Sequence, residues 1–466
     1  MQIADKVYFV GIGGIGMANL ARYYLFKGAS VAGYDRTPSD LTRALEKEGA
    51  TVAYTDDPAV AIPASMQADN STLVVYTPAV PDSSPLLRFF RSRGYEVIKR
   101  AALLGKITSH SDGICVAGSH GKTTTSSMIA HILHTSPVGC NAFLGGILRN
   151  YDSNLLLSEH SRWSVIEADE YDRSFHHLSP YVAVITSTDP DHLDIYGNEE
   201  NYLESFAHFT ELIREGGTLL VHTGLKLKPR VRPGVKTFTY SGKGDPADYW
   251  AENVRHTDGR LLFDFVGPDG LRIDSIELGV PVAINVDNAV AAIAASLIAG
   301  ADTDSIRSAM ASFMGPKRRF EIWMRPDAEH PDSPVLIDDY GHSPGEVEAS
   351  IASVKALWPD KKLTVVFQPH LYTRTRDFAP EFARALSKAD RVILCEIYPA
   401  RELPIPGVTS EIIFRDIKSP EKFLIQRKDL LETAKNINFE ILMTLGAADI
   451  NLLLPGLRDL LESRIG

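Results

Sequence analysis

The sequence predicts an α/β protein of three domains, each built on a mainly parallel sheet with flanking helices. The chain has 466 residues, which is too long for one domain at roughly 100–200 residues per domain. Its hydrophobic content of 44% and charged content of 23% are typical of a globular protein. Three times along the chain, a short apolar strand leads into a helix and then into further strands. We expect domains over residues 1–107, 108–317 and 318–466.

The first domain is expected to be Rossmann-like. Residues 6–10 (KVYFV) form a short apolar run typical of a buried strand, and a helix is expected over 15–27. Residues 30–35 (SVAGYD) then complete a strand–helix–strand unit. Further strands at 73–76 and 95–98 continue the parallel sheet.

The central domain is expected to have a mainly parallel sheet with an antiparallel flank. Its main elements are a strand at 113–117, a helix at 122–134, strands at 163–167 and 182–186, and an alanine-rich helix at 287–300. Between about 217 and 280 the sequence changes to short β runs separated by Gly/Pro turns. Such turns are typical of antiparallel strands, so we expect the flank there.

The third domain is again expected to be Rossmann-like. Apolar runs alternate with helical segments, and the runs lie at 335–338, 363–367, 391–396 and 441–445. In a parallel sheet the carboxyl ends of such strands form the edge where ligands bind. We therefore expect binding residues directly after these strands.

Composition excludes several classes of protein. A formal net charge of −11 argues against broad nucleic-acid binding. No stretch approaches the ~20 apolar residues of a membrane span, and the N-terminal segment lacks the residue order of a signal peptide. The cysteines are too few and too scattered for a disulfide framework, which favours reduced thiols in a cytoplasmic protein: Cys115, Cys140 and Cys395.

The strongest local signal is a glycine loop between a strand and a helix. Such a loop presents backbone N–H groups to phosphate oxygens at the positive end of the helix. Lys122 can reach the β- and γ-phosphates, and the Thr123 hydroxyl can bind Mg²⁺. The alternative is a plain glycine turn followed by a surface lysine. The central domain is therefore predicted to be a P-loop ATPase domain. The residues predicted to hold the phosphates of ATP are Gly118, Ser119, His120, Gly121, Lys122, Thr123 and Thr124.

Two acidic turns follow strands of the same domain. Glu167-Ala168-Asp169-Glu170 ends one strand, and Asp189-Pro190-Asp191-His192-Leu193-Asp194 follows the next. Oxygen donors with one imidazole suit Mg²⁺ or Mn²⁺ held between protein and phosphates. A solvated acidic loop is the alternative.

The N-terminal domain carries a second glycine-rich loop. Gly11-Ile12-Gly13-Gly14-Ile15-Gly16-Met17 follows the first strand, and Asp35 ends the second strand about 20 residues on. This pattern fits a dinucleotide, with pyrophosphate on the helix N-terminus and the acid on a ribose. A UDP-sugar offers the same groups, so both NAD and a UDP-sugar fit the residues.

Two asparagines at the start of the alanine-rich helix are candidate adenine contacts. Asn285 and Asn288 are three residues apart and share one helix face. Each offers a donor and an acceptor, which matches the edge of adenine. Helix capping is the alternative.

Several of these motifs resemble those of the Mur ligase family. The phosphate loop is similar to the family's Gly-Thr-X-Gly-Lys-Thr/Ser, with Ser119 in place of threonine. The acidic turns resemble its Glu-Ala-Asp-Glu and Asp-His-X-Asp motifs, and Lys317-Arg318-Arg319-Phe320 resembles its Gly-X-X-Arg-Arg-Phe. The resemblance implies Glu167 and His192 as metal ligands, Thr123 on the metal shared with ATP, and Arg319 on an ATP phosphate.

The resemblance covers nearly the whole chain and implies ligands for the other domains. The first loop resembles the Gly-X-Gly-Gly-X-Gly-Met of the family's alanine-adding branch, which holds a UDP-sugar. The contacts implied for that sugar nucleotide are Gly13, Gly14, Gly16, Met17, Asp35 and Thr77. In the third domain, residues 338–344 resemble Asp-Asp-Tyr-Gly-His-His-Pro, and 367–375 resemble Phe-Gln-Pro-His-X-Tyr-X-Arg-Thr. The implied contacts are Asp338 for ATP, and Tyr340, His342, His370 and Arg374 for the amino acid.

The chain departs from the family pattern at five further positions. They are Ser187 for asparagine, Val282 for glycine, Ile284 and Ser343 for histidines, and Leu371 for an arginine. If Leu371 lies in the amino-acid site, one positive charge that would bind the amino acid is missing, and binding of the α-carboxylate depends more on Arg374. Its planar, always-charged fork suits an α-carboxylate.

The implied activity is ATP-dependent ligation of L-alanine to the carboxylate of UDP-N-acetylmuramate in peptidoglycan synthesis, through an acyl phosphate. We expect a cytoplasmic monomer or homodimer that neither binds nucleic acid nor inserts into a membrane. The alternatives are a peptide-recycling ligase of the same family and a nucleotide-dependent oxidoreductase. The Phe-Gln-Pro-His motif disfavours the first, and the Gly-Lys-Thr loop with Asp-His-X-Asp disfavours the second.

Overall fold

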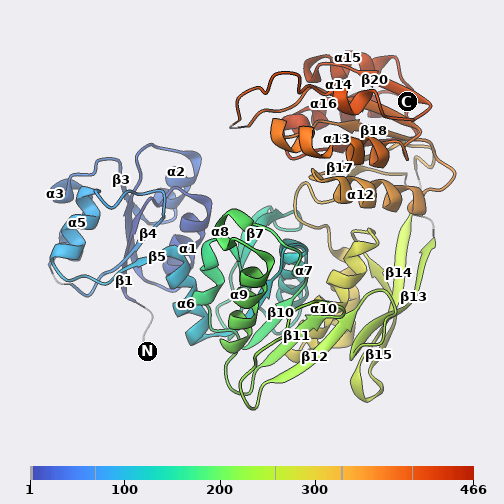
Figure 1. Cartoon of the computed structure of the whole chain (residues 1–466). Helices are drawn as coiled ribbons and strands as arrows, with labels where there is room; N and C mark the ends of the chain where they lie inside the picture. The colour runs from blue at the N-terminus through green and yellow to red at the C-terminus, as the bar shows by residue number, and fades with distance from the viewer. Residues whose placement is uncertain (1–3, 69, 258, 327–328, 401, 466) are drawn as a thin grey trace.

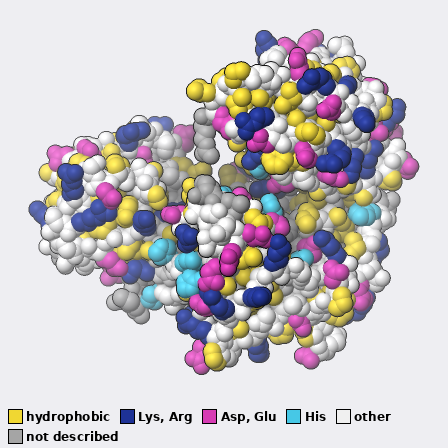
Figure 2. Space-filling view, viewed as in Figure 1, with side chains coloured by type: hydrophobic (Ala, Val, Ile, Leu, Met, Phe, Trp, Pro, Cys, Tyr) yellow, Lys and Arg dark blue, Asp and Glu magenta, His cyan; other side chains and the backbone are white. Residues whose placement is uncertain are grey.

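The protein consists of three lobes, each built around its own β-sheet (Figure 1). The computed structural model describes residues 4–68, 70–257, 259–326, 329–400 and 402–465. The three-domain α/β architecture predicted from the sequence is confirmed. The surface is hollowed where the lobes face one another (Figure 2).

The N-terminal lobe contains a fully parallel sheet. Its strands are, in spatial order, β3 (Thr51–Ala53), β2 (Ser30–Tyr34), β1 (Lys6–Val10), β4 (Leu73–Tyr76) and β5 (Val97–Lys99). The order reverses beside β1, so the loop after β1 lies at the switch point where ligands bind in such sheets. The helices are α1 (Ile15–Phe26), α2 (Asp40–Lys47), α3 (Pro58–Ala61), α4 (Ala64–Gln67), α5 (Pro85–Ser92) and α6 (Arg100–His110).

The central lobe contains a ten-stranded mixed sheet. Its strands are, in spatial order, β15 (Arg272–Leu278), β14 (Arg260–Val266), β13 (Tyr249–Thr257), β12 (Lys236–Ser241), β11 (Thr218–His222), β10 (Val182–Ile185), β6 (Asp112–Ala117), β9 (Trp163–Glu167), β7 (Asn141–Leu148) and β8 (Ser153–Leu156). The expected antiparallel flank is narrower than residues 217–280, because β11 and β12 extend the parallel sheet and only β13–β15 run antiparallel. A short antiparallel pair, β7 and β8, closes the other edge.

Helices cover both faces of this sheet and carry most of the loops of interest (Figure 1). The helical segments are α7 (Lys122–Thr135), η1 (Tyr171–His177), α8 (Leu193–Tyr196), α9 (Glu199–Glu211), η2 (Pro268–Gly270), α10 (Ile284–Ile298) and α11 (Thr303–Ser312). Helix α10 is buried along most of its length because its alanines allow close packing against α7.

The C-terminal lobe has a six-stranded sheet with one antiparallel edge. Its strands are, in spatial order, β16 (Glu321–Met324), β17 (Val335–Asp339), β21 (Ile441–Leu445), β18 (Leu363–Phe367), β19 (Arg391–Leu394) and β20 (Glu421–Leu424). The helical segments are α12 (Pro344–Leu357), α13 (Tyr372–Leu386), α14 (Glu411–Phe414), η3 (Arg427–Asp429), α15 (Leu430–Lys435), η4 (Asp449–Leu453) and α16 (Leu454–Glu462).

The first two lobes share a packed contact. Helix α6 runs across the predicted boundary at 107/108 and lies so close to η1 that a Cβ on Gly105 would be 2.1 Å from the carbonyl oxygen of His177. The ring centroids of Tyr23 on α1 and Phe143 on β7 are 5.4 Å apart. The sequence-based boundaries themselves stay predictions.

The central and C-terminal lobes are joined by a short linker. Arg149 Nε lies 3.1 Å from Glu321 Oε1, and its Nη2 donates to the carbonyl of Ile322 at 3.2 Å.

Within the described ranges, no helix combines the length and the apolar composition needed to cross a bilayer.

Candidate functional site

The phosphate loop joins β6 to α7 and depends on two glycines. Gly118 has φ +145° and Gly121 has φ +82°, which is a backbone region that favours glycine. A Cβ on Gly118 would lie 2.1 Å from Thr186 Oγ1, and one on Gly121 would lie 2.6 Å from Asn288 Oδ1. Because these two glycines have no side chains, the end of strand β10 and helix α10 can lie directly against the loop.

Hydrogen bonds tie this loop to the end of β10. The Ser119 hydroxyl donates to the carbonyl of Asp189 at 2.5 Å and lies 2.9 Å from Tyr202 Oη. The backbone N–H of His120 donates to Ser187 Oγ at 2.7 Å. Ser187, which stands where the family has asparagine, thus supports the loop through its hydroxyl. Thr124 lies in the first turn of α7.

Lys122 has a buried acidic partner that sequence reasoning did not assign to it. Its Nζ lies 2.8 Å from the Glu170 carboxylate and donates to the carbonyl of Gly118 at 2.5 Å. The side chains of Lys122 and Glu170 are 14% and 1% exposed. Glu170 is the last residue of the Glu-Ala-Asp-Glu motif. The motif therefore indicated an acidic residue here, but it did not indicate that Lys122 is its partner.

The structure brings two of the three predicted metal ligands together. Thr123 Oγ1 donates to Glu167 Oε1 at 3.0 Å, and the N–H of Gly145 donates to Glu167 Oε2 at 3.0 Å. Burial raises the pKa of the Glu167 carboxyl, against the hydrogen bond from Thr123 and the charge of Lys122. A hydroxyl and one carboxylate suit Mg²⁺, which usually binds one or two carboxylates together with phosphate oxygens.

His192, the third predicted ligand, contacts Tyr171 and Asp191. Its ring contacts the Tyr171 ring edge-on at 5.2 Å between centroids, and its Nε2 is 3.8 Å from Asp191 Oδ2. Among the described residues, no group of three or more His, Cys, Asp or Glu side chains is arranged to hold a metal ion. The hydrogen-bonded pair of Thr123 and Glu167 fits a metal shared with ATP, and the role of His192 stays a prediction.

Asn285 and Asn288 are buried and bonded to one another. Asn288 Nδ2 donates to Asn285 Oδ1 at 3.0 Å, and Thr125 Oγ1 on α7 donates to Asn288 Oδ1 at 3.1 Å. Helix α10 is capped by Ala283 without a side-chain hydrogen bond, so neither asparagine caps it. The pair fastens α10 to the helix that carries the phosphate loop.

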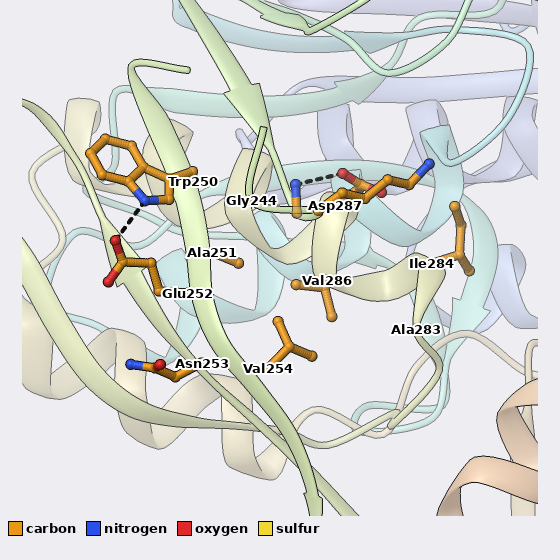
Figure 3. Close-up of a pocket in the computed structure, with 12 residues that line it drawn as sticks. Gly244, Trp250, Ala251, Glu252, Asn253, Val254, Ala283, Ile284, Val286 and Asp287 are labelled. Atoms are coloured by element: carbon orange, nitrogen blue, oxygen red, sulfur yellow. Dashed lines mark hydrogen bonds between the residues drawn. The ribbon is translucent and has the colours of Figure 1, made fainter. Parts of the chain in front are cut away.

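A cavity of about 720 Å³ opens beside the start of α10, between this helix and β13 (Figure 3). Its walls include Trp250, Ile284, Val286 and Asp287, but neither of the two asparagines. Asp287 accepts the N–H of Gly242 at 2.6 Å. Ile284, which replaces the family's histidine, is 54% exposed. The cavity wall thus includes an apolar side chain that is open to solvent.

Strand β11 contributes one charged contact near the same cavity. His222 Nε2 lies 3.0 Å from Asp287 Oδ1. The hydrogen bond to Asp287 raises the pKa of the His222 imidazole. Asp287 therefore holds both a backbone amide and an imidazole, which fixes the start of α10 against the sheet.

The N-terminal glycine loop is close-packed around Asp35. The N–H of Gly13 donates to Asp35 Oδ2 at 2.8 Å, and a Cβ on Gly11 would lie 2.6 Å from the methyl group of Thr77. Gly14 caps α1 without any side-chain bond. Met17 is buried, with 2% of the residue exposed. The loop, Asp35 and Thr77 thus lie together, as the UDP-sugar prediction requires.

A cavity of about 400 Å³ connects this loop to the central lobe. Its walls include Gly16 and Arg100 from the first lobe and Phe143, Glu167 and Asp169 from the second. The candidate sugar-nucleotide loop and the candidate metal ligand Glu167 therefore face one space. Sequence reasoning identified both but had no signal for their proximity.

In the C-terminal lobe, basic and aromatic groups cluster at the end of β17. The guanidinium groups of Arg318 and Arg319 lie 5.1 and 5.3 Å from the Tyr340 ring centroid. The His342 ring meets the Tyr340 ring edge-on at 5.3 Å. Burial lowers the pKa of His342, and the charges of Arg374 and Arg319 act in the same direction. Arg374, in the first turn of α13, thus acts on the same cluster through its charge.

The turn before α13 and the first turn of that helix hold the other predicted amino-acid contacts. His370 stacks on Tyr398 with centroids 6.0 Å apart and an interplanar angle of 12°. Leu371 has φ +71°, an unusual conformation for a leucine, and it is half-buried at the turn. Arg374 Nη1 is buried without a hydrogen-bond partner in the described part of the chain. A buried guanidinium nitrogen of this kind is a ready donor for an anionic group.

Asp338 lies inside the lobe rather than at a surface. It is 0% exposed, Thr444 Oγ1 donates to it at 2.6 Å, and Arg318 Nε lies 3.2 Å away. Burial raises its pKa to about 6, despite the charge of Arg318. In this arrangement the carboxylate holds Arg318 in place at the linker, and its predicted contact with ATP stays a prediction.

These three sites, on three successive α/β lobes, define a class of protein: the chain belongs to the Mur ligase family. Residues 6–112 match the model of the Mur ligase family, catalytic domain. Residues 116–296 match the Mur ligase middle domain, and 318–448 match the Mur ligase, glutamate ligase domain.

Particular relatives are similar over almost the full chain. The UDP-N-acetylmuramate–L-alanine ligase of Parabacteroides distasonis is 54% identical over 459 residues, 98% of either chain. The enzyme of the same name from Porphyromonas gingivalis W83 is 50% identical over 459 residues, 98% of this chain and 99% of the relative.

Solved structures show the same arrangement of domains. The UDP-N-acetylmuramate-alanine ligase of Thermotoga maritima is 27% identical with a TM-score of 0.72, over 98% of this chain and 99% of that one. The MurF ligase of Thermotoga maritima in complex with ADP has a TM-score of 0.64 at 18% identity, over the whole of both chains. The latter likeness concerns the fold alone.

Proposed function

We propose that this protein is the ATP-dependent ligase that joins L-alanine to the carboxylate of UDP-N-acetylmuramate in peptidoglycan synthesis. The relatives that are 50–54% identical carry this name. The observation that carries the proposal is the 400 Å³ cavity, which extends from the glycine loop of the first lobe to Glu167. Glu167 is hydrogen-bonded to Thr123 of the phosphate loop, so a sugar nucleotide in this cavity would present its carboxylate near the end of ATP.

The first step is phosphoryl transfer to that carboxylate. One carboxylate oxygen attacks the γ-phosphorus, the bond to the β-phosphate oxygen breaks, and ADP leaves with an acyl phosphate formed. Lys122 and the loop N–H groups stabilise the charge on the phosphate oxygens. Mg²⁺, held by Thr123 and Glu167, would supply further charge neutralisation there.

The second step forms the amide bond. The free amine of L-alanine attacks the acyl carbon, phosphate leaves with the bonding electrons, and the nitrogen loses a proton. Arg319 stabilises the oxyanion of the tetrahedral intermediate. Arg374 holds the alanine carboxylate, since a planar guanidinium can form two parallel hydrogen bonds to it. His342, His370 and Tyr340 border the same site.

The proposed substrates are a nucleotide sugar and ATP, and we therefore propose a cytoplasmic location. The test is phosphate release by the purified protein with ATP, Mg²⁺ and UDP-N-acetylmuramate, and with L-alanine, glycine, L-serine or an L-alanine-initiated tripeptide as the acceptor. We expect the highest kcat/KM with L-alanine. Preference for the tripeptide would instead indicate a peptide ligase, and no phosphate release with any acceptor would refute the proposal.

A further inference from the structure

The cavity between the first two lobes has charges of opposite sign on its walls. Arg100, the first residue of α6, lies on one side with Gly16 of the glycine loop. Glu167 and Asp169, at the end of β9, lie on the central-lobe side. A ligand that spans the cavity therefore meets a cation at one end and carboxylates at the other.

Arg100 is held against the glycine loop. Its Nη1 lies 2.3 Å from the position that a Cβ on Gly16 would occupy, so the guanidinium takes the space that a side chain there would fill. The residue is half-buried, and it forms no hydrogen bond or ion pair across the described ranges. The first turn of α1 beside it contains no acidic residue, and its cap provides no side-chain acceptor. A partly buried cation without a counter-ion, next to unsatisfied N–H groups, favours binding of an anion.

We propose that Arg100 binds the diphosphate of the UDP-sugar and thereby sets which way the sugar points. This inference rests on the proposed function. UDP-N-acetylmuramate has two anionic parts, the diphosphate and the lactyl carboxylate. The carboxylate must reach the phosphoryl group near Thr123 and Glu167. The diphosphate is then at the opposite end, beside Arg100 and away from the carboxylates of Glu167 and Asp169.

The chemistry of the two ends supports this orientation. A diphosphate is repelled by unscreened carboxylates and is bound well by a guanidinium, which can donate two parallel hydrogen bonds to it. Because Gly16 has no side chain, the Arg100 guanidinium can reach the first turn of α1. Arg100 and the N-terminus of α1 can therefore bind the same diphosphate from two sides.

The test is calorimetric binding of UDP-N-acetylmuramate, UDP and uridine to the full-length protein and to Arg100→Gln. We expect Arg100→Gln to weaken UDP-N-acetylmuramate and UDP alike by tenfold or more, about 1.4 kcal/mol. Uridine and ATP should bind as to the wild type. Arg88→Gln is the matched control, because it removes one exposed charge from the same lobe, and all its affinities should be unchanged.

Several results would overturn the inference. Unchanged UDP binding with weaker UDP-N-acetylmuramate binding would assign Arg100 to the carboxylate. Equal losses for UDP and uridine would indicate a structural role. If Arg100→Gln also loses ATP binding, Arg100→Lys decides: we expect threefold to tenfold weaker UDP with uridine unchanged, and unchanged UDP would refute the contact. Failure of the wild type to bind UDP-N-acetylmuramate would instead count against the proposed function itself.

Discussion

Replacement of Lys122 by alanine should reduce both activity and stability, for two separate reasons. The ammonium lies 2.8 Å from the Glu170 carboxylate, and the two side chains are 14% and 1% exposed. Lys122→Ala leaves Glu170 buried without its cation. Removal of one partner of a buried ion pair costs about 3–5 kcal/mol of folding free energy. Loss of the charge at the phosphates should lower kcat by on the order of 10²–10³ or more.

A second substitution separates the two effects. Glu170→Gln makes the buried group neutral, so the double variant Lys122→Ala/Glu170→Gln should regain most of the lost stability and none of the lost activity. The free energy of unfolding is measured by equilibrium urea titration, and kcat is measured by phosphate release. The ligand-free protein is used for the unfolding measurement, so that ATP binding does not contribute.

Two outcomes would refute this reasoning. If Lys122→Ala unfolds at the wild-type urea midpoint, the ion pair with Glu170 contributes no stability. If the double variant keeps kcat within a few-fold of the wild type, Lys122 does not stabilise the transferred phosphoryl group, and the assignment of the loop to ATP fails.

Three further predictions concern other parts of the molecule. Glu167→Gln should raise the Mg²⁺ concentration for half-maximal activity while the Kd for ATP changes little, and an unchanged Mg²⁺ titration would remove Glu167 from the metal site. Arg374→Lys should raise the KM for L-alanine at least tenfold, about 1.4 kcal/mol, because lysine cannot make the two parallel hydrogen bonds of a guanidinium. An equal rise in KM for all three substrates would contradict this role. Burial lowers the pKa of His131 from 6.5 to about 4, so the stability from this neutral imidazole is present above pH 6.5 and is lost as the pH falls toward 4. That loss is roughly 3 kcal/mol, and His131→Leu should flatten the dependence of urea stability on pH between 4 and 6.5.

The positions of many elements were predictable because their signals are local. The strands β1, β4, β9, β18 and β21 have the predicted bounds, since each is an apolar run that ends at a glycine or a polar residue. The phosphate loop was recognisable for the same reason: strand, glycines, lysine and helix follow one another directly. Strands without such a run, such as β3 and β8, were not predicted.

The contacts within the site were decided by the tertiary structure. Glu170 was recognisable as an acid after a strand, but its pairing with Lys122 depends on β6 and β9 being neighbours in the sheet. Asp338 belongs to a motif, yet its side chain is turned into the lobe, where it holds Arg318. The side chain of a strand residue points to one of two faces, and sequence pattern alone does not say what lies on that face.

The sequence by itself determined the family, the order of the three sheets and the loops that carry glycines, acids and basic residues. Each of these features depends on a few consecutive residues, so a local pattern is enough to recognise it. Only the tertiary structure decided that Arg100 lies against Gly16, that both face the cavity of Glu167, and that the His192 ring meets the Tyr171 ring. The physical reason is that these distances are set by the packing of helices between lobes, in which side chains far apart in sequence compete for the same space.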